Sequence, residues 1–545
     1  MPAAAAETFT EDEHRILSPY FTNTDSHVFA LTNLPETVKG ALFARYSRSA
    51  KSLRRLFLDE FAKDLDGVAG TVSSIGLARA EKLYAKVFNE YGDDSVAQLG
   101  GAHLACEYVS NVLTKVLEWG RLMAYLEQST RYVPYTDKLH GRWRYHTPAE
   151  IQGALRQRYA QTLDRTFEAY ASQIDRMQAY FAERYPRAPQ DSEAVHRSAV
   201  RAKALDTLRG MLPAATQSNV GIYGTGQAFE SLLLRMRAHP LGEVRSCADQ
   251  MLAELRKVIP AFLTRVDQPD RGGRWSEYFA EQRAAMRRMA DTLLEDVPAE
   301  HRPEVTLTDF DPDGEIKIVA SALYAASDLP DDQLLARART MTADERAAVL
   351  KAYIGNRANR RHRPGRAFER TTYRFDVLTD YGAFRDLQRH RLLTLEWQPL
   401  TTRHGYNEPE ALTEAGALDA WTAVMDASSE LYEALRSAGL EAVAPYAVSM
   451  AYRVRFYMEM NAREAMHLIE LRTAPQGHPA YRRVCQEMHR LIAERAGHTA
   501  VAAAMQFADH TAVELERLKA EREIERRRHA LTLRHEDHKD HKETC

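Results

Sequence analysis

The chain reads Gln388-Arg389-His390-Arg391 in its second half and Glu127-Gln128-Ser129-Thr130-Arg131-Tyr132 in its first half. In the first of these motifs, two guanidinium forks flank an imidazole, a combination that suits phosphate, carboxylate or an anionic ring system. The other motif supplies hydrogen-bond donors and acceptors for a nucleobase or a sugar. The alternatives are a solvated basic face for residues 388–391 and a helix cap with a surface loop for residues 127–132.

A third polar motif lies on a predicted helix near the end of the second half. Asn461-Ala462-Arg463 is followed by His467 and then by Arg472. Arg463 and His467 are four residues apart and therefore share a helix face. A helical stripe of Arg, His and Arg faces either solvent or an anion.

Together these motifs resemble the flavin-dependent thymidylate synthases, the ThyX family. The family signature is Arg-His-Arg followed by Ser and then by a Glu-x-Ser-x-Arg-Tyr element, and here its front and back stand in different halves of the chain. The other matches are the Asn-Ala-Arg helix with its later Arg (Asn461, Arg463, Arg472), the Arg-x-x-Leu-Pro segment (Arg209–Pro213) and an element similar to Pro-Phe-Glu (Ala367–Glu369).

The resemblance covers residues 85–265 and 303–500, so it implies a tandem repeat. It predicts an α+β fold, mostly helical, with two thymidylate synthase complementing protein-like repeats that each contain a small sheet. We assign residues 1–300 to the first repeat and residues 301–511 to the second. Residues 512–545 are nearly all charged, and we expect a solvated C-terminal helix or tail.

The departures from the family pattern divide the signature between the repeats. In the second repeat, Pro399 replaces the family Ser, and Glu441 replaces the Arg of the Leu-Pro segment. His467 replaces an Asn of the family pattern, and Asp386 replaces a Gln. In the first repeat, Trp119-Gly120-Arg121 replaces Arg-His-Arg, and Thr225-Gly226-Gln227 replaces Asn-Ala-Arg. Neither repeat keeps a whole site, so the resemblance implies one working composite site and one that is dead.

The resemblance also implies a role for each motif residue. The catalytic group comprises Arg389, His390, Arg391 and Ser129. The flavin would be held by Arg389, His390, Arg391, Asn461, Arg463, His467 and Glu369. The nucleotide would be held by Glu127, Gln128, Ser129, Arg131, Arg209 and Arg472. No metal site is assigned.

The activity that the resemblance implies is reductive methylation of dUMP to dTMP. FAD is the expected cofactor, and methylenetetrahydrofolate and NADPH are the expected co-substrates. Two alternatives stay open: flavin-dependent methylation of another uridine nucleotide, and a protein that binds flavin or nucleotide without turnover. Because family sites lie between subunits of a tetramer, we expect a homodimer of this chain to imitate that tetramer.

Composition limits the other classes of function. The net charge of −3 disfavours a dedicated nucleic-acid binder, the least favoured alternative. The sequence contains no run of about 18 apolar residues, so we expect no membrane-spanning helix. Residues 1–7 lack the features of a signal peptide. Four cysteines without a Cys-x-x-Cys motif fit a reducing compartment. We therefore expect a cytoplasmic enzyme with a small-molecule substrate.

Hydrophobic periodicity gives a coarse secondary structure. We expect strands at 303–311 and 373–378, and a strand or a helix at 316–324. From residue 410 onward the pattern indicates helix. Further helices are expected at 36–66, 103–127, 151–184, 193–211, 225–237, 243–265 and 276–295.

Overall fold

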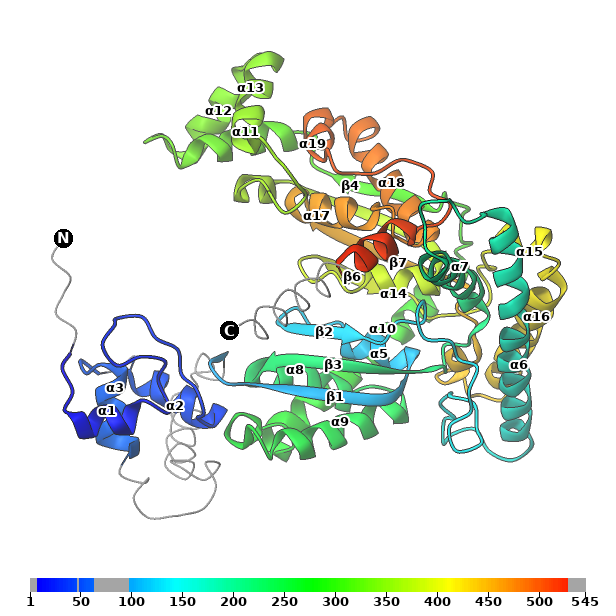
Figure 1. Cartoon of the computed structure of the whole chain (residues 1–545), viewed down its shortest axis with the longest axis horizontal. Coiled ribbons are helices and arrows are strands. Elements are labelled where there is room, and N and C mark those ends of the chain that lie inside the picture. Colours follow the sequence, from blue (N-terminus) through cyan, green and yellow to red (C-terminus); the bar gives the residue numbers. More distant parts are fainter. Residues whose placement is uncertain (1–6, 47–48, 63–97, 528–545) are drawn as a thin grey trace, which may run out of the picture. The chain divides into compact units, whose positions relative to one another are not determined.

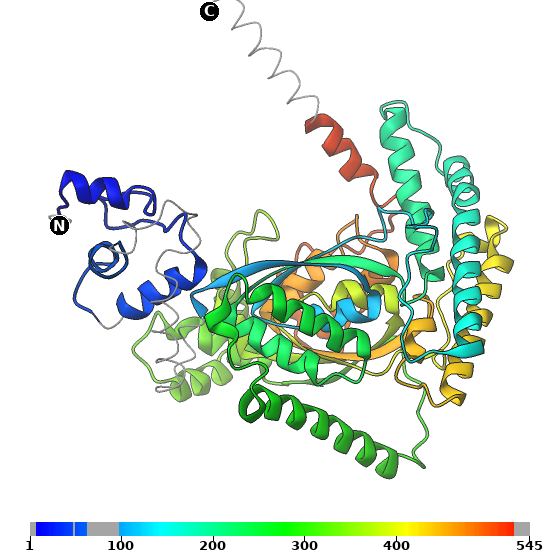
Figure 2. The same cartoon turned by 90° about the horizontal axis from the view of Figure 1, so that it is seen from below.

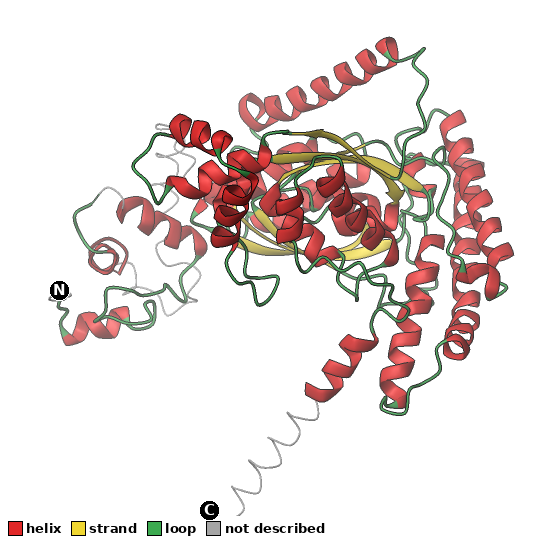
Figure 3. Ribbon diagram, turned by 90° about the horizontal axis from the view of Figure 1, so that it is seen from above, coloured by secondary structure: helices red, strands yellow, loops and turns green. Residues whose placement is uncertain are grey.

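The computed structural model of this chain describes residues 7–46, 49–62 and 98–527. The chain divides into two compact units that interleave along the sequence. The first unit contains residues 1–107, 116–127 and 219–297, and the second contains residues 108–115, 128–218 and 298–545. The described part is mostly helical with two small sheets, which confirms the α+β prediction (Figure 3).

A three-stranded sheet, most of which belongs to the first unit, has the strand order β1-β3-β2 (Figure 1). Its strands are β1 (Gly101–Ser110), β2 (Met123–Glu127) and β3 (Gln217–Thr225). Strands β2 and β3 are antiparallel, with Met123 opposite Gly224. The helices of this unit are α1 (Glu11–Leu17), α2 (Glu36–Tyr46), α3 (Leu53–Leu56), α8 (Gly226–Arg237), α9 (Gly242–Leu255) and α10 (Arg274–Leu293). Helix α5 (Asn111–Leu117) follows β1.

The second unit contains a four-stranded sheet with the strand order β4-β5-β7-β6. Its strands are β4 (Val305–Phe310), β5 (Thr372–Asp380), β6 (Thr394–Trp397) and β7 (Arg453–Asn461). Each pair of neighbouring strands is antiparallel. Along β7, Phe456 and Met458 are buried, whereas Arg455, Tyr457 and Glu459 are partly exposed. One face of this sheet therefore packs on the core of the unit.

Long helices complete the second unit. Helix α6 packs against α7 and also lies beside α16 (Figures 1 and 2). The helices are α6 (Gly153–Arg184), α7 (Glu193–Leu208), α11 (Gly314–Tyr324), α12 (Asp331–Thr340), α13 (Ala343–Ile354), α14 (Tyr381–Leu387), α15 (Ala411–Glu414), α16 (Leu418–Ser437), α17 (Ala462–Arg472), α18 (Pro479–Glu494) and α19 (Thr499–Ala504). Among the described residues, no helix is both long and apolar enough to span a membrane.

The two sheets share an order of elements. One series runs β1-α5-β2 and later β3-α8-α9, and the other runs β5-α14-β6 and later β7-α17-α18. The strand orders β1-β3-β2 and β5-β7-β6 correspond. In both series, the last residue of the third strand caps the next helix: Thr225 accepts from the Ala228 backbone N–H, and Asn461 accepts from that of Glu464.

The prediction of a helix over residues 103–127 is wrong. The chain there forms β1, the short helix α5 and β2. In β1, Cys106 is buried while Ala105 and Glu107 are exposed, which is the two-residue period of a strand. The apolar residues after Val109 fit a helix well, and this local pattern concealed the strand before it.

The helical pattern expected from residue 410 onward is interrupted, because residues 453–461 form a strand. Residues 217–225, between two expected helices, also form a strand. Residues 316–324, for which both strand and helix were open, lie in the helix α11. The charged C-terminal segment is not wholly solvated, because Glu516 is buried and forms an ion pair with Lys203. The tail from residue 528 lies outside the described residues.

A buried ion pair joins α17 to the segment before β5. Arg357 donates from Nη1 and Nη2 to the two carboxylate oxygens of Glu470, at 2.7 and 2.6 Å, and both side chains are 1% exposed. Arg357 Nη1 also donates to the Ala504 carbonyl (2.6 Å). Removal of one partner would leave an uncompensated buried charge.

We expect Arg357→Ala to destabilise the region around α17 by about 3–5 kcal/mol. Backbone amides of α17 should then exchange with solvent on the order of 100-fold faster or more. Hydrogen-exchange mass spectrometry measures this. The control is Arg366→Ala, because the Arg366 side chain is 86% exposed in its pair with Glu369. Equal exchange rates in the two variants would contradict the prediction.

Candidate active site

Helix α14 positions the Arg-His-Arg motif within the second unit. The Tyr381 hydroxyl donates to the Asn111 carbonyl (3.0 Å), and Gln388 Nε2 donates to the Lys115 carbonyl (2.7 Å). These contacts fix both ends of the short helix. In the turn that follows, His390 is buried, Arg389 is partly exposed and Arg391 is exposed.

The hydrogen bonds of His390 determine which ring nitrogen carries its proton. Arg472 Nε can only donate, and it lies 2.9 Å from His390 Nε2. Nε2 is therefore the acceptor, and Nδ1 carries the hydrogen that faces Glu464 Oε1 at 3.2 Å. Burial, together with nearby positive charges such as that of Arg472, lowers the pKa of His390 well below 6.5. The imidazole is thus neutral at pH 7.

Glu464 and His467 complete this group on α17. Burial raises the pKa of Glu464 to about 7, although nearby arginines such as Arg363 oppose the shift. Burial and the charge of Arg363 lower the pKa of His467 to about 4. The guanidinium Nη2 of Arg363 lies 2.9 Å from His467 Nδ1.

His390, Glu464 and His467 also have the ligand types of a metal site, and their ligand atoms all lie within 4.8 Å of one another. However, Arg472 already donates to His390, and Arg363 is hydrogen-bonded to His467. A cation placed there would also meet the repulsion of these two guanidinium groups. The surroundings favour an anion.

The other residues predicted to hold flavin lie near the N-terminus of α17. Arg463 Nε donates to the Pro364 carbonyl (2.9 Å), and its Nη1 lies 3.6 Å from Glu369 Oε1. The Asn461 side chain caps the helix by accepting from the Glu464 N–H (2.9 Å). The structure therefore brings Arg463, Glu369 and Asn461 to one end of α17, whose later turn carries His467.

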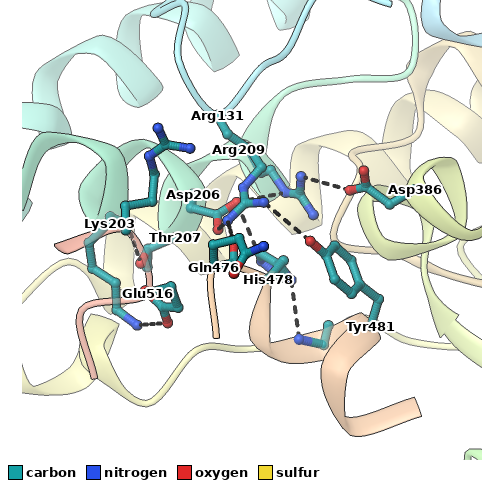
Figure 4. A network of polar contacts seen from close by, with 12 residues as sticks. Arg131, Lys203, Asp206, Thr207, Arg209, Asp386, Gln476, His478, Tyr481 and Glu516 are labelled. Carbon is teal, nitrogen blue, oxygen red and sulfur yellow. Dashed lines mark hydrogen bonds and ion pairs between the residues drawn. The ribbon is translucent and has the colours of Figure 1, made fainter. Parts of the chain in front are cut away.

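The buried carboxylate of Asp386 draws three arginines together (Figure 4 shows its contact with Arg209). Arg209 Nη1 lies 3.5 Å from Asp386 Oδ2, and Arg472 Nη1 lies 3.8 Å from Oδ1. Arg389 Nη2 donates to the same Oδ1. Burial alone would raise the pKa of Asp386, but the arginines outweigh it and hold the pKa well below the usual 3.8.

Asp206, on α7, is a second buried carboxylate that contacts arginines. Its Oδ2 lies 2.9 Å from Arg131 Nη2, and its Oδ1 lies 3.4 Å from Arg209 Nε and 3.8 Å from His478 Nε2. Burial would raise the pKa of Asp206, yet the guanidinium groups of Arg131 and Arg209 help to lower it. For His478, burial dominates and lowers the pKa to about 3, so this ring is neutral at pH 7.

Arg131 links the first-half signature to this cluster. Its Nη1 donates to the Tyr481 hydroxyl (3.3 Å), and its Nη2 donates to the Gln476 carbonyl (3.2 Å). The guanidinium of Arg472 lies over the ring of the same Tyr481, 5.5 Å from its centroid. We call Arg131, Arg209, Arg389, Arg472, Asp206 and Asp386 the arginine–aspartate cluster; all six residues belong to the second unit.

The rest of the first-half signature lies along the same loop. Ser129 Oγ accepts from the Arg131 backbone N–H (3.2 Å), which closes a turn before that arginine. The Gln128 carbonyl accepts from Ser218 Oγ (3.4 Å). Glu127 is the last residue of β2 and belongs to the first unit.

A cavity of about 610 Å³ adjoins the cluster within the second unit. Its lining includes Asp206, Arg209 and His478, and the aromatic residues Phe181 and Trp421. Arg209 Nη2 is buried and finds no hydrogen-bond partner among the residues that the structure describes. The volume lies within the range of small-molecule sites, and the unpartnered guanidinium nitrogen offers a donor to an anionic ligand.

Sequence reasoning missed several residues of this site. Asp206 precedes Arg209 by three residues on a helix, a spacing at which side chains meet, and this signal was available. Gly382 was also missed. A Cβ there would lie 3.3 Å from Arg209 Nε, so the glycine gives this arginine room beside α14. Tyr481 belongs to none of the motifs, and only the tertiary packing brings it and His478 here.

Comparison with known proteins agrees with the resemblance found in the motifs. The model of one family, described as thymidylate synthase complementing protein, matches residues 40–261 and 306–496, more than half of the chain. The chain belongs to the thymidylate synthase complementing protein family. Members of this family therefore provide the relevant comparison for both halves of the chain.

Individual proteins show how this member of the thymidylate synthase complementing protein family relates to others. A UPF0159 protein of Chlamydia muridarum is 37% identical over 94% of this chain and 98% of its own length. A flavin-dependent thymidylate synthase of Clostridium tetani is 26% identical over 37% of this chain and 73% of its own. A solved UMP/dUMP methylase from Streptomyces cacaoi is 19% identical, covers 38% of this chain and 97% of its own, and has a TM-score of 0.29.

The raised pKa of Glu464 predicts a distinct pH dependence of stability. A carboxyl with a folded-state pKa near 7 and an ordinary value of 4.5 stabilises the fold fully below pH 4.5. This contribution is lost as the pH rises through about 7. We expect Glu464→Gln to gain stability relative to the native chain between pH 5 and pH 8, by on the order of 2–3 kcal/mol.

Thermal unfolding of both proteins across this pH range measures the difference. Glu459→Gln is the matched control, since Glu459 is 42% exposed in its pair with Arg374. Melting curves of the Glu464→Gln variant that shift with pH in parallel with the native protein would contradict the prediction.

Proposed function

We propose that this chain is a flavin-dependent enzyme that converts dUMP to dTMP, with methylenetetrahydrofolate as carbon donor and NADPH as reductant. One observation carries the proposal. Arg131 and Arg209, from first-half motifs, meet Arg389 and Arg472, from second-half motifs, in a single cluster. This is the composite arrangement that the divided signature of a thymidylate synthase complementing protein requires.

The residues near α17 fit a flavin. His390 and His467 lie with ring centroids 5.4 Å apart, and Arg363 and Arg463 stand beside them. Such guanidinium groups suit both the phosphates of FAD and an anionic reduced ring. When bound, the flavin would supply the reducing equivalents, and Arg389, His390, Arg463 and His467 would hold it.

The chain's own residues would bind and orient the nucleotide. Arg209 offers the free Nη2 to a phosphate oxygen, and Arg131 adds a second fork nearby. Bidentate contacts of this kind fix direction as well as energy. The neutral His390 keeps its proton on Nδ1 against Glu464, so its orientation is set before any ligand arrives.

A comparison of α8 with α17, aligned at their capping residues, supports one flavin site per chain. Aligning Thr225 with Asn461 places Gln227, Ser231 and Met236 of α8 where α17 has Arg463, His467 and Arg472. Helix α8 therefore lacks the two arginines and the histidine that α17 carries at these positions. We propose that the chain arose by tandem duplication, that it works as a homodimer, and that each chain holds one productive site.

The decisive experiment is an absorption spectrum of the purified protein, followed by dUMP titration and a methyl-transfer assay. Flavin bands that shift with dUMP, together with dTMP formation, support the proposal. A shift with UMP and methylation of UMP alone would favour another uridine nucleotide as substrate. Flavin binding without turnover would favour a binding protein. A colourless protein that FAD cannot reconstitute would overturn the proposal.

We expect Arg209→Ala to weaken dUMP binding by about 10- to 150-fold, the equivalent of a lost charged hydrogen bond of about 1.5–3 kcal/mol. Isothermal titration measures the affinity. Arg436→Ala is the control, because Arg436 forms an exposed pair with Glu433 on α16. Unchanged affinity in a folded Arg209→Ala protein would show that this arginine does not contact the nucleotide.

Flavin content tests the one-site proposal separately. We expect about one FAD per chain, because of the two equivalent helices α17 carries the Arg463, His467 and Arg472 stripe and α8 does not. Absorbance of released FAD against protein concentration gives the ratio. Arg463→Ala should lower the content, and Gln227→Ala, at the equivalent place on α8, should leave it unchanged. A ratio near two would contradict the proposal.

A further inference from the structure

Asp386 is one of two carboxylates in a cluster that contains four arginines. Its carboxylate contacts Arg209, Arg389 and Arg472, each from a different segment of the chain. Its side chain is 11% exposed, so water screens these contacts little. Asp386 therefore alters the charge that the cluster presents to a ligand.

The cluster is assembled from two similar pairs. Asp206 and Arg209 stand three residues apart, and so do Asp386 and Arg389. Each pair carries no net charge. The contact of Arg209 with Asp386 joins one pair to the other. Arg131, 2.9 Å from Asp206, and Arg472, 3.8 Å from Asp386, then add two positive charges to pairs that are already neutral.

The balance of charge suggests the class of ligand. Four arginines and two ionised aspartates leave a net charge of +2, since His390 and His478 are neutral at pH 7. A phosphomonoester carries about −1.5 to −2 at this pH. One phosphomonoester thus neutralises the cluster, whereas a diphosphate or triphosphate would leave an excess of negative charge in a largely buried place.

We propose that Asp386 is a specificity-determining residue that makes the cluster select a nucleoside monophosphate over the diphosphate and triphosphate. With an uncharged side chain at this position, the cluster would hold one more positive charge and would prefer the more highly charged phosphates. The inference rests on the proposed function, because it takes the cluster as the place where the nucleotide phosphate binds.

Calorimetric titration with inorganic phosphate and pyrophosphate tests the inference. The full chain is used, with any flavin that it carries left in place. We expect Asp386→Asn to bind pyrophosphate about 10- to 100-fold more tightly, as one extra charge a few ångströms away predicts. Phosphate binding should gain less, so the ratio of the two affinities shifts toward pyrophosphate. Asp386→Glu keeps the charge and should keep the native ratio.

A second variant tests the inference if Asp386→Asn does not fold. Arg472→Gln lowers the cluster charge and should shift the ratio in the opposite direction, toward phosphate. Asp376→Asn is the control, because Asp376 pairs with Arg455 on the sheet and not with the cluster. A ratio that stays unchanged in both cluster variants would overturn the inference.

The same experiment separates this inference from the proposed function. If the native protein binds phosphate and the ratio does not respond to residue 386 or 472, the inference fails and the nucleotide proposal stands. If neither anion binds any variant, the inference also fails. The shift of the flavin spectrum with dUMP then decides the proposed function independently.

Discussion

Two buried carboxylates, those of Asp206 and Asp386, hold together guanidinium groups that would otherwise repel one another. Each aspartate pairs with an arginine three residues later on its own segment, so each segment brings a nearly neutral unit into the packed interior. Separate arginines without these acids would meet strong repulsion in a region of low dielectric. The convergence of the first-half and second-half motifs depends on this neutralisation.

The interleaving of the two units makes that convergence possible within one chain. Residues 128–218 continue the first repeat in sequence, but they belong to the second unit, which also contains the sheet of β4 to β7. This segment carries Arg131 on its first loop and Arg209 at the end of α7. The proposed repeats and the observed units divide the chain differently. The repeats reflect the proposed duplication, whereas the units reflect which residues contact one another.

The sequence predicted some parts of the site better than others. Arg131, Arg209, Arg389 and Arg472 belong to motifs, and the structure gathers them. Arg391 also belongs to a motif, but its side chain is exposed. Among the elements, the sequence predicts strand β5 correctly. It predicts helix where β1 lies, because the apolar residues of α5 have a helical spacing that extends over the residues before them.

The sequence by itself determined the fold class, the family and the identity of the cations, because periodicity and motifs are local properties of the chain. Only the tertiary structure decided which charges meet. Asp206 and Asp386 lie far apart in the sequence, yet folding brings both within 3.5 Å of Arg209. His478, from a third segment, lies 3.8 Å from Asp206. Burial also sets the neutral state of His390 and the raised pKa of Glu464, since desolvation depends on everything packed around a group and not on its neighbours in sequence.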